Sequence, residues 1–292
     1  MSFNWRRLGS EELEAQFNPR MAVPDFQRHF IGWTEHSAAA KARIDGEYDI
    51  RYGTGKLQTL DLHRPPKGSG GAPLVLLVHG GYWRGLDKDT MTFAAEPFLA
   101  AGGVVANLNY DLCPAVSLDT IVRQMQEALT FCAERAAGWG ADAARLHVIG
   151  HSAGAHLAAM MAAAPWPADL PAPPSIASLG LVSGVYDLEP VLHISVNADI
   201  RLDDAMARRN SVMRFPPAQG GILRGPVLVA AGDAEPEGWQ AQSVDFHQAC
   251  RDAGTPAHLM RINGANHFDI LYPLADPAKP LGNHLLRQTG LL

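Results

Sequence analysis

Short apolar runs alternate with amphipathic segments along most of the chain, from about residue 72 onward. The runs are rich in Val, Ile and Leu, which is typical of parallel strands buried on both faces, and the amphipathic segments suit the helices that connect them. We predict strands at 73–81, 102–110, 145–152, 176–184, 225–233 and 257–262. We predict helices near 89–101, 117–136, 152–164, 239–253 and 281–290. The pattern indicates an α/β fold with a mostly parallel central sheet flanked by helices.

Three other segments depart from this alternation. Residues 47–65 contain two alternating strands around "GTGK" and predict an antiparallel hairpin, followed by a loop at 65–73. The interval 185–224 is too long for one connection and one helix, so we predict an inserted lid there. Residues 1–45 are rich in helix formers and predict a helical N-terminal arm, which leaves 46–292 as a single α/β domain.

Composition narrows the class of protein. Of the 292 residues, 47% are hydrophobic and 18% are charged, so the chain can bury a substantial core. The net charge of −6 and the lack of a basic run argue against nucleic acid as a partner. No apolar run is long enough to span a bilayer, and no signal-like segment is found, so we expect a cytoplasmic protein without a membrane partner. The sequence is compatible with a homodimer.

Cysteine usage agrees with a reducing compartment. Cys113, Cys132 and Cys250 are scattered, odd in number and lack C-x-x-C spacing. This pattern fits neither a disulfide framework nor a zinc site.

The segment "HVIGHSAGAHL" places a G-x-S-x-G motif around Ser152, after a predicted strand and before a predicted helix. In this context the motif is typical of a nucleophile elbow, where glycines let the chain turn sharply and present the serine hydroxyl above the sheet. The start of the following helix also favours a developing negative charge. We therefore predict Ser152 as a nucleophile.

A serine nucleophile needs a base and an acid that orients the base. His267 follows the last predicted strand, which is the position of the base in this fold order. Asp233 ends the penultimate strand and is our prediction for the acid. Glu235 and Glu237 in the same loop, and Asp187 one strand earlier, could serve as the acid instead.

The segment "HGGYW" at residues 79–83 follows the first strand of the parallel series. Loops at this position supply the second donor of an oxyanion hole in hydrolases with this elbow. We predict that the backbone N–H groups of Gly81, Tyr82 and Ala153 form that hole. Trp83 and His151 are candidates for substrate contact, although the aromatic residues could also cap a tight loop, with Trp83 packed in the core.

Other polar residues are weaker candidates. His193, Asn197 and Arg201 lie in the predicted lid and could contact substrate, but a solvated loop would carry the same residues. His156 lies four residues after the nucleophile on the same helix and is expected to be buried and hydrogen-bonded rather than a second base.

The motifs "HGGYW", "GHSAGAHL", "SGVYDL" and "GANHFDIL", with "QFNPRMAVPDF" near the start, resemble the kynurenine formamidase (arylformamidase) branch of the α/β-hydrolases, near the hormone-sensitive-lipase-like esterases. The likeness extends from about residue 15 to 275. It implies an α/β-hydrolase fold, a triad of Ser152, Asp233 and His267, and no metal or organic cofactor. The acid loop is about two residues longer than in the eukaryotic members, which leaves the choice between Asp233 and the neighbouring glutamates open.

The resemblance also implies a function. The expected substrate is a small-molecule aryl amide with a formyl or acetyl group, such as N-formylkynurenine. A short-chain carboxylesterase is the second possibility, and a hydrolase fold that serves only as a binding protein is a third class. The two aromatic residues after the glycine pair favour a small acyl group, because they should narrow the space beside the reacting carbonyl.

Overall fold

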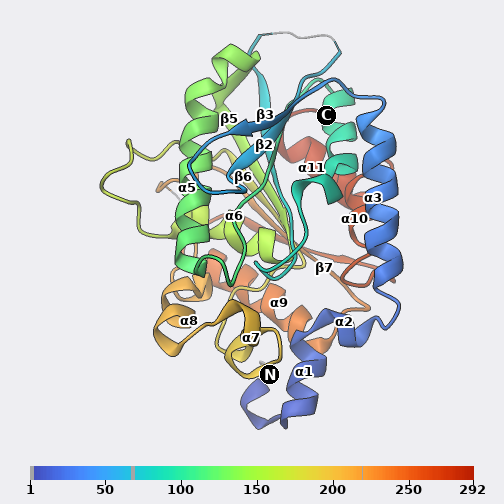
Figure 1. Ribbon diagram of the computed structural model, residues 1–292, viewed down its shortest axis with the longest axis vertical. Coiled ribbons are helices and arrows are strands. Elements are labelled where there is room, and N and C mark those ends of the chain that lie inside the picture. The colour runs from blue at the N-terminus through green and yellow to red at the C-terminus, as the bar shows by residue number, and fades with distance from the viewer. Residues whose placement is uncertain (1–2, 67–69, 219) are drawn as a thin grey trace.

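The computed structural model describes residues 3–66, 70–218 and 220–292, so part of the predicted loop at 65–73 lies outside the described residues. Its centre is an eight-stranded sheet with the order β1-β2-β4-β3-β5-β6-β7-β8 (Figure 1). The strands are β1 (Gly46–Arg51), β2 (Thr59–His63), β3 (Ala72–Val78), β4 (Val104–Leu108), β5 (Ala141–His151), β6 (Ser178–Val182), β7 (Val227–Gly232) and β8 (Ala257–Ile262). β2 pairs antiparallel with both β1 and β4, and the pairs from β4 through β8 are parallel.

Helices occupy the connections between the parallel strands and the two ends of the chain. They are α1 (Ser10–Phe17), α2 (Pro19–Ala22), α3 (Gln27–Lys41), α4 (Glu96–Ala100), α5 (Leu118–Arg135), α6 (Ala153–Ala163), α7 (Asn197–Ile200), α8 (Asp204–Asn210), α9 (Glu237–Asp252), α10 (Leu271–Leu274) and α11 (Pro280–Gln288). The predicted helix at 89–101 is wrong in part, because two 3₁₀ turns precede a short α4. Pro97 stands in the first turn of α4, where a missing N–H is tolerated, so the helix starts there.

The two faces of the sheet carry separate apolar cores. Leu74, Leu76 and Val78 of β3 belong to one cluster, which includes residues of α5, α6 and α9. Val75 and Leu77 belong to the other, which includes residues of α3, α4, α10 and α11. Because successive side chains of a strand point to opposite faces, this division explains why β3 is an unbroken apolar run.

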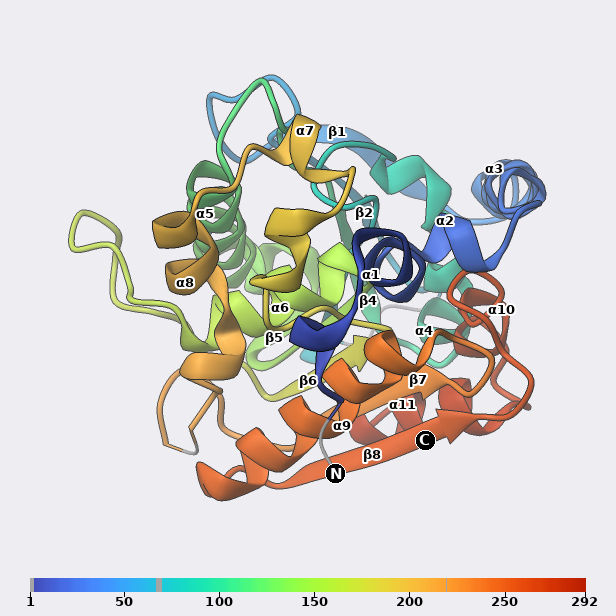
Figure 2. The same ribbon diagram turned by 90° about the horizontal axis from the view of Figure 1, so that it is seen from below.

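The N-terminal segment lies beside the long connection between β6 and β7. α1 packs against the 3₁₀ turn at Pro190–His193 and against α9 (Figures 1 and 2). Glu14 of α1 accepts hydrogen bonds from the backbone N–H of Ser195 (2.7 Å) and from its hydroxyl (2.6 Å). These contacts bring the start of the chain over the carboxyl ends of the central strands.

Within the described part of the chain, no helix has the length and apolar character needed to cross a membrane.

Candidate active site

Ser152 stands in the sharp turn between β5 and α6. Its backbone has φ 57° and ψ −122°, a conformation that is strained for a residue with a side chain. A Cβ on Gly150 would lie 2.2 Å from the carbonyl oxygen of Gly154, and one on Gly154 would lie 2.1 Å from that of Val78. The two glycines of the motif are therefore required by close backbone packing, which holds the strained turn in place.

His267 lies beside Ser152, as the order along the chain predicts. Its Nε2 is 3.0 Å from the hydroxyl oxygen of Ser152. Both side chains are buried, and the imidazole packs edge to face against Trp239 with ring centroids 4.7 Å apart. The histidine is thus positioned to take the hydroxyl proton of the serine.

Glu235, and not Asp233, is the carboxylate that faces this histidine. Oε2 of Glu235 lies 3.3 Å from Nδ1 of His267. Its Oε1 accepts hydrogen bonds from the backbone N–H of Gly232 (2.9 Å) and from the hydroxyl of Ser183. These donors satisfy the buried carboxylate and fix its orientation.

The prediction of Asp233 as the acid is wrong, because β7 ends at Gly232 and the next two residues turn outward. Asp233 is exposed, and its Oδ1 accepts a hydrogen bond from the N–H of Gly264 at 2.6 Å. The chain then turns back and buries Glu235.

Glu237 and Asp187, the remaining acidic candidates, do not reach the histidine. Glu237 is exposed at the start of α9. Asp187 accepts a hydrogen bond from the N–H of Glu189 at 3.1 Å. Of the four acidic candidates, Glu235 is the one whose carboxylate contacts His267.

The glycine pair at 80 and 81 places the loop after β3 against the nucleophile. A Cβ on Gly80 would lie 3.0 Å from Cβ of Ser152. The carbonyl of Gly80 accepts hydrogen bonds from Nδ1 of His79 (2.7 Å) and from the hydroxyl of Tyr110 (3.3 Å). Because a trans peptide directs its N–H opposite to its C=O, the N–H of Gly81 points away from those two side chains.

A second peptide of the loop is oriented in the same way. The carbonyl of Gly81 accepts a hydrogen bond from the N–H of Arg84 (3.1 Å), which directs the N–H of Tyr82 away from Arg84. Across residues 3–66, 70–218 and 220–292, the amides of Gly81, Tyr82 and Ala153 have no hydrogen-bond acceptor. Gly81 and Tyr82 share the cavity wall with Ser152, and Ala153 follows it, so these three free N–H groups are candidate donors for an oxyanion.

Tyr82 and Trp83 diverge after the glycine pair, since both have left-handed backbones with φ of 52° and 55°. Tyr82 lines the cavity in front of Ser152, and its hydroxyl donates to the carbonyl of Phe17 at 2.6 Å. Trp83 is fully buried beneath it, with its ring 5.0 Å from that of His156. Of the two alternatives for Trp83, packing in the core is the one found, and the substrate contact is not, because the turn directs its side chain into the core.

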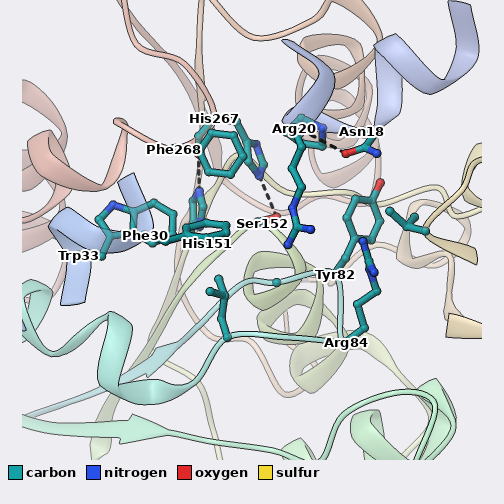
Figure 3. Close-up of a pocket in the computed structure, with 14 residues that line it drawn as sticks. Asn18, Arg20, Phe30, Trp33, Tyr82, Arg84, His151, Ser152, His267 and Phe268 are labelled. Atoms are coloured by element: carbon teal, nitrogen blue, oxygen red, sulfur yellow. Dashed lines mark hydrogen bonds between the residues drawn. The ribbon is translucent and has the colours of Figure 1, made fainter. Parts of the chain in front are cut away.

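His151 does line the cavity, and a hydrogen bond to the loop that carries His267 holds its ring in place. Its Nε2 donates a hydrogen bond to the backbone carbonyl of His267 at 2.8 Å (Figure 3). Burial lowers the pKa of His151 to about 3, so the ring is neutral at physiological pH. The neutral ring ties the backbone of the histidine loop to the elbow.

The cavity in front of Ser152 is small, with a volume of about 40 Å³. Much of its wall comes from residues that the sequence analysis did not predict. They are Asn18, Pro19, Arg20, Phe30 and Trp33 of the N-terminal segment, with Arg84, Leu86, Val196 and Phe268. The conspicuous "QFNPRMAVPDF" segment was the available signal for the first three of them.

The polar candidates of the predicted lid do not line this cavity. His193 packs beside Trp5 with ring centroids 5.9 Å apart, and Asn197 accepts a hydrogen bond from the N–H of Leu202 (2.8 Å). Arg201 is exposed. The expectation for His156 is confirmed: it is buried, and its Nε2 donates to the carbonyl of Asn210 at 2.7 Å.

A serine bonded to a histidine, with a carboxylate behind it at the carboxyl edge of a mostly parallel sheet, defines an α/β-hydrolase of the serine type. Comparison with known proteins agrees with this class. Residues 60–169 match the protein family BD-FAE. Kynurenine formamidases of Danio rerio and Salmo salar are 30% and 31% identical, each over 98% of this chain and 99% and 98% of their own length. The chain belongs to the kynurenine formamidase branch of the hormone-sensitive-lipase-like α/β-hydrolases, and it is a hydrolase.

Solved structures support the same fold. A putative thioesterase from Silicibacter sp. tm1040 superposes with a TM-score of 0.78 at 27% identity, covering 92% of this chain and 97% of that one. Esterase B from Lactobacillus rhamnosis superposes with a TM-score of 0.68 at 18% identity, covering 94% and 95%.

Proposed function

We propose that the enzyme hydrolyses small-acyl aryl amides, with aryl formamides such as N-formylkynurenine as the preferred class. The observation that carries this proposal is the aromatic wall of the cavity, which Phe30, Trp33 and Phe268 form beside Ser152. Residues 79–83, which we call the oxyanion loop, contribute Gly81 and Tyr82 to the same cavity. Flat apolar side chains suit a planar aromatic leaving group. The names of the relatives in fish point to the same substrate class.

The proposed reaction is a two-step acyl transfer. The oxygen of Ser152 attacks the carbonyl carbon while Nε2 of His267 takes the hydroxyl proton, and the oxyanion accepts hydrogen bonds from the free amides of the loop and of α6. His267 then gives the proton to the departing amine, and the C–N bond breaks. Water repeats the sequence: it loses a proton to His267, attacks the acyl-enzyme and releases the acid and the serine.

Glu235 has an electrostatic and orienting role in this proposal. Its carboxylate accepts from Nδ1 of His267, which keeps the basic nitrogen directed at Ser152 and stabilises the imidazolium that forms. The backbone N–H of Gly232 and the hydroxyl of Ser183 donate to Oε1 of Glu235 and hold the carboxylate in place.

The ring of Tyr82 limits the space for the acyl group of the substrate, which is why we expect a preference for a small one. Its ring stands next to Gly81 in the cavity wall and is fixed by the hydrogen bond to Phe17 and by edge-to-face packing on Trp239 (5.9 Å). A formyl or acetyl group adds little bulk beside this ring, whereas a long acyl chain would have to displace it.

The experiment is a substrate panel of formanilide, acetanilide and the 4-nitrophenyl esters of acetate, butyrate and octanoate. We expect formanilide and the acetate ester to give the highest kcat/KM, and Ser152→Ala to abolish turnover and labelling by a fluorophosphonate. Faster hydrolysis of octanoate than of every short-acyl substrate would contradict the proposal.

A short-chain carboxylesterase is the second candidate. A relative named esterase LipQ, from Mycobacterium tuberculosis, is 28% identical over 91% of this chain. The same panel separates the two functions, because an esterase would hydrolyse 4-nitrophenyl acetate and leave formanilide and acetanilide intact.

A further inference from the structure

The wall of the cavity carries two guanidinium groups and no carboxylate. Arg20 comes from α2, and Arg84 follows the oxyanion loop (Figure 3). Asp and Glu are absent from the fourteen residues that line the cavity. The cavity wall in front of Ser152 therefore has basic but no acidic side chains, although the protein as a whole carries a net charge of −6.

The two guanidinium groups differ in their partners. Arg84 forms an ion pair with Asp199, and Glu14 adds a favourable charge near it. Arg20 forms no ion pair within residues 3–66, 70–218 and 220–292. Its guanidinium lies over the rings of Phe26 (5.0 Å) and Phe30 (5.7 Å), which position its plane but leave its N–H groups free.

The backbone of Arg20 is fixed before any ligand binds. Asn18 caps α2 by accepting from the N–H of Arg20 (3.2 Å), and its amide donates to Glu14 (2.6 Å), which in turn holds Ser195. Partial burial and the nearby charge of Arg84 lower the pKa of Arg20, and no carboxylate among the residues that line the cavity offsets these two effects. A bound carboxylate would offset them.

We propose that Arg20 is a specificity-determining residue that binds a carboxylate on the leaving group of the substrate. This proposal rests on the proposed function: if the acyl group is formyl or acetyl, a carboxylate can be carried only by the amine part. A guanidinium presents paired N–H donors that match the two oxygens of a carboxylate, and Arg84 adds a second positive charge at the same wall. The preferred substrate is then an anionic aryl amide rather than a neutral one.

The test compares formanilide with formanilides that carry a carboxylate at the ortho, meta or para position. For the wild-type enzyme we expect at least one acid to exceed formanilide in kcat/KM by about 10- to 100-fold, the range of a charge-assisted hydrogen bond. Arg20→Gln should remove most of this preference through a higher KM, and Arg20→Lys should restore part of it. Arg7→Gln is the matched control, because it removes the same charge from an exposed position of the same N-terminal segment, outside the cavity.

A second measurement separates this inference from the proposed function. Anthranilate should inhibit hydrolysis of 4-nitrophenyl acetate competitively, with an inhibition constant about 10-fold higher in Arg20→Gln than in the wild type. If no formanilide is hydrolysed but this difference is found, the proposed function fails and the carboxylate site stands. If formanilides are hydrolysed but neither the preference nor the inhibition changes in Arg20→Gln, the inference about Arg20 is overturned.

Discussion

Nδ1 of His267 faces Oε2 of Glu235 across 3.3 Å, in a buried contact between two loops at the end of the sheet. The nearby Asp233 is exposed and bonded to the N–H of Gly264. We therefore expect substitutions of Glu235 and of Asp233, which lie in the same short loop, to have different effects on activity.

Replacing Glu235 with Gln should lower kcat by about 10³- to 10⁴-fold, because an amide cannot stabilise the imidazolium and can hold the wrong tautomer of His267. Asp233→Asn is the matched control and should change kcat by less than about threefold, since an amide oxygen can still accept from Gly264. Steady-state kinetics with 4-nitrophenyl acetate checks both. A large loss in Asp233→Asn with an active Glu235→Gln would show that the acid has been misassigned.

Substituting Gly81 with Ala should disable the oxyanion loop. The residue has φ +107°, and a Cβ there would lie 2.0 Å from the carbonyl oxygen of Gly85. Displacing this peptide removes a donor to the oxyanion, so we expect kcat to fall by at least about 10²-fold. The measurement is kcat together with the melting temperature.

Gly85→Ala is the control for that variant, because a Cβ at Gly85 would meet no atom closer than 4.0 Å. It should keep its activity within about twofold. Equal losses in the two variants would indicate general damage to the loop rather than the loss of an aligned amide at Gly81.

Tyr82→Phe should loosen the contact between the N-terminal segment and the oxyanion loop. The substitution removes the hydroxyl that donates to the carbonyl of Phe17 and leaves a buried acceptor without its donor, which costs about 1 to 3 kcal/mol. We expect a lower melting temperature and faster proteolysis near residue 17, with kcat for 4-nitrophenyl acetate reduced less than tenfold. An unchanged proteolysis pattern would show that this hydrogen bond does not hold the segment.

Acidification should destabilise the folded protein through buried histidines. Burial lowers the pKa of His147 to about 4, of His151 to about 3 and of His156 to about 4. Between about pH 6.5 and pH 4, these histidines bind protons in the unfolded chain but not in the folded protein. Their contribution to the free energy of unfolding is therefore fully present above pH 6.5 and is lost as the pH falls. Urea unfolding at pH 7 and at pH 4.5 measures this loss.

His156→Gln should reduce the loss by about 1 to 2 kcal/mol, because it removes one of the groups that must be protonated on unfolding. His36→Gln, at an exposed position, should leave the difference between the two pH values unchanged. If His156→Gln is as acid-sensitive as the wild type, burial of this imidazole is not what limits stability at low pH.

The elbow and the position of the base could be predicted from the sequence, because both follow from local rules. Ser152 needs its flanking glycines, and His267 follows the last strand of the sheet. The acid could not be chosen in this way. The turn after β7 buries Glu235 with the help of Ser183, which is far away along the chain, and no local pattern encodes that contact.

The walls of the cavity were predicted less well for a related reason. The place of Trp83 in the HGGYW motif makes it a candidate for substrate contact, but two consecutive left-handed residues direct the side chains of Tyr82 and Trp83 to different places. Arg20 contributes through the docking of a terminal segment against the rest of the fold, and docking of this kind depends on tertiary contacts such as that between Glu14 and Ser195.

Because the N-terminal segment docks onto the rest of the fold, part of the cavity wall and the Ser152 site are encoded in different parts of the gene. Ser152, Glu235 and His267 are encoded after residue 78, whereas Arg20 and Phe30 of the cavity wall are encoded near the start. Recombination or insertion at the 5′ end could therefore exchange the preferred leaving group while the reaction itself is inherited intact. Among relatives with the same elbow, differences in substrate preference should therefore be sought in the first forty residues.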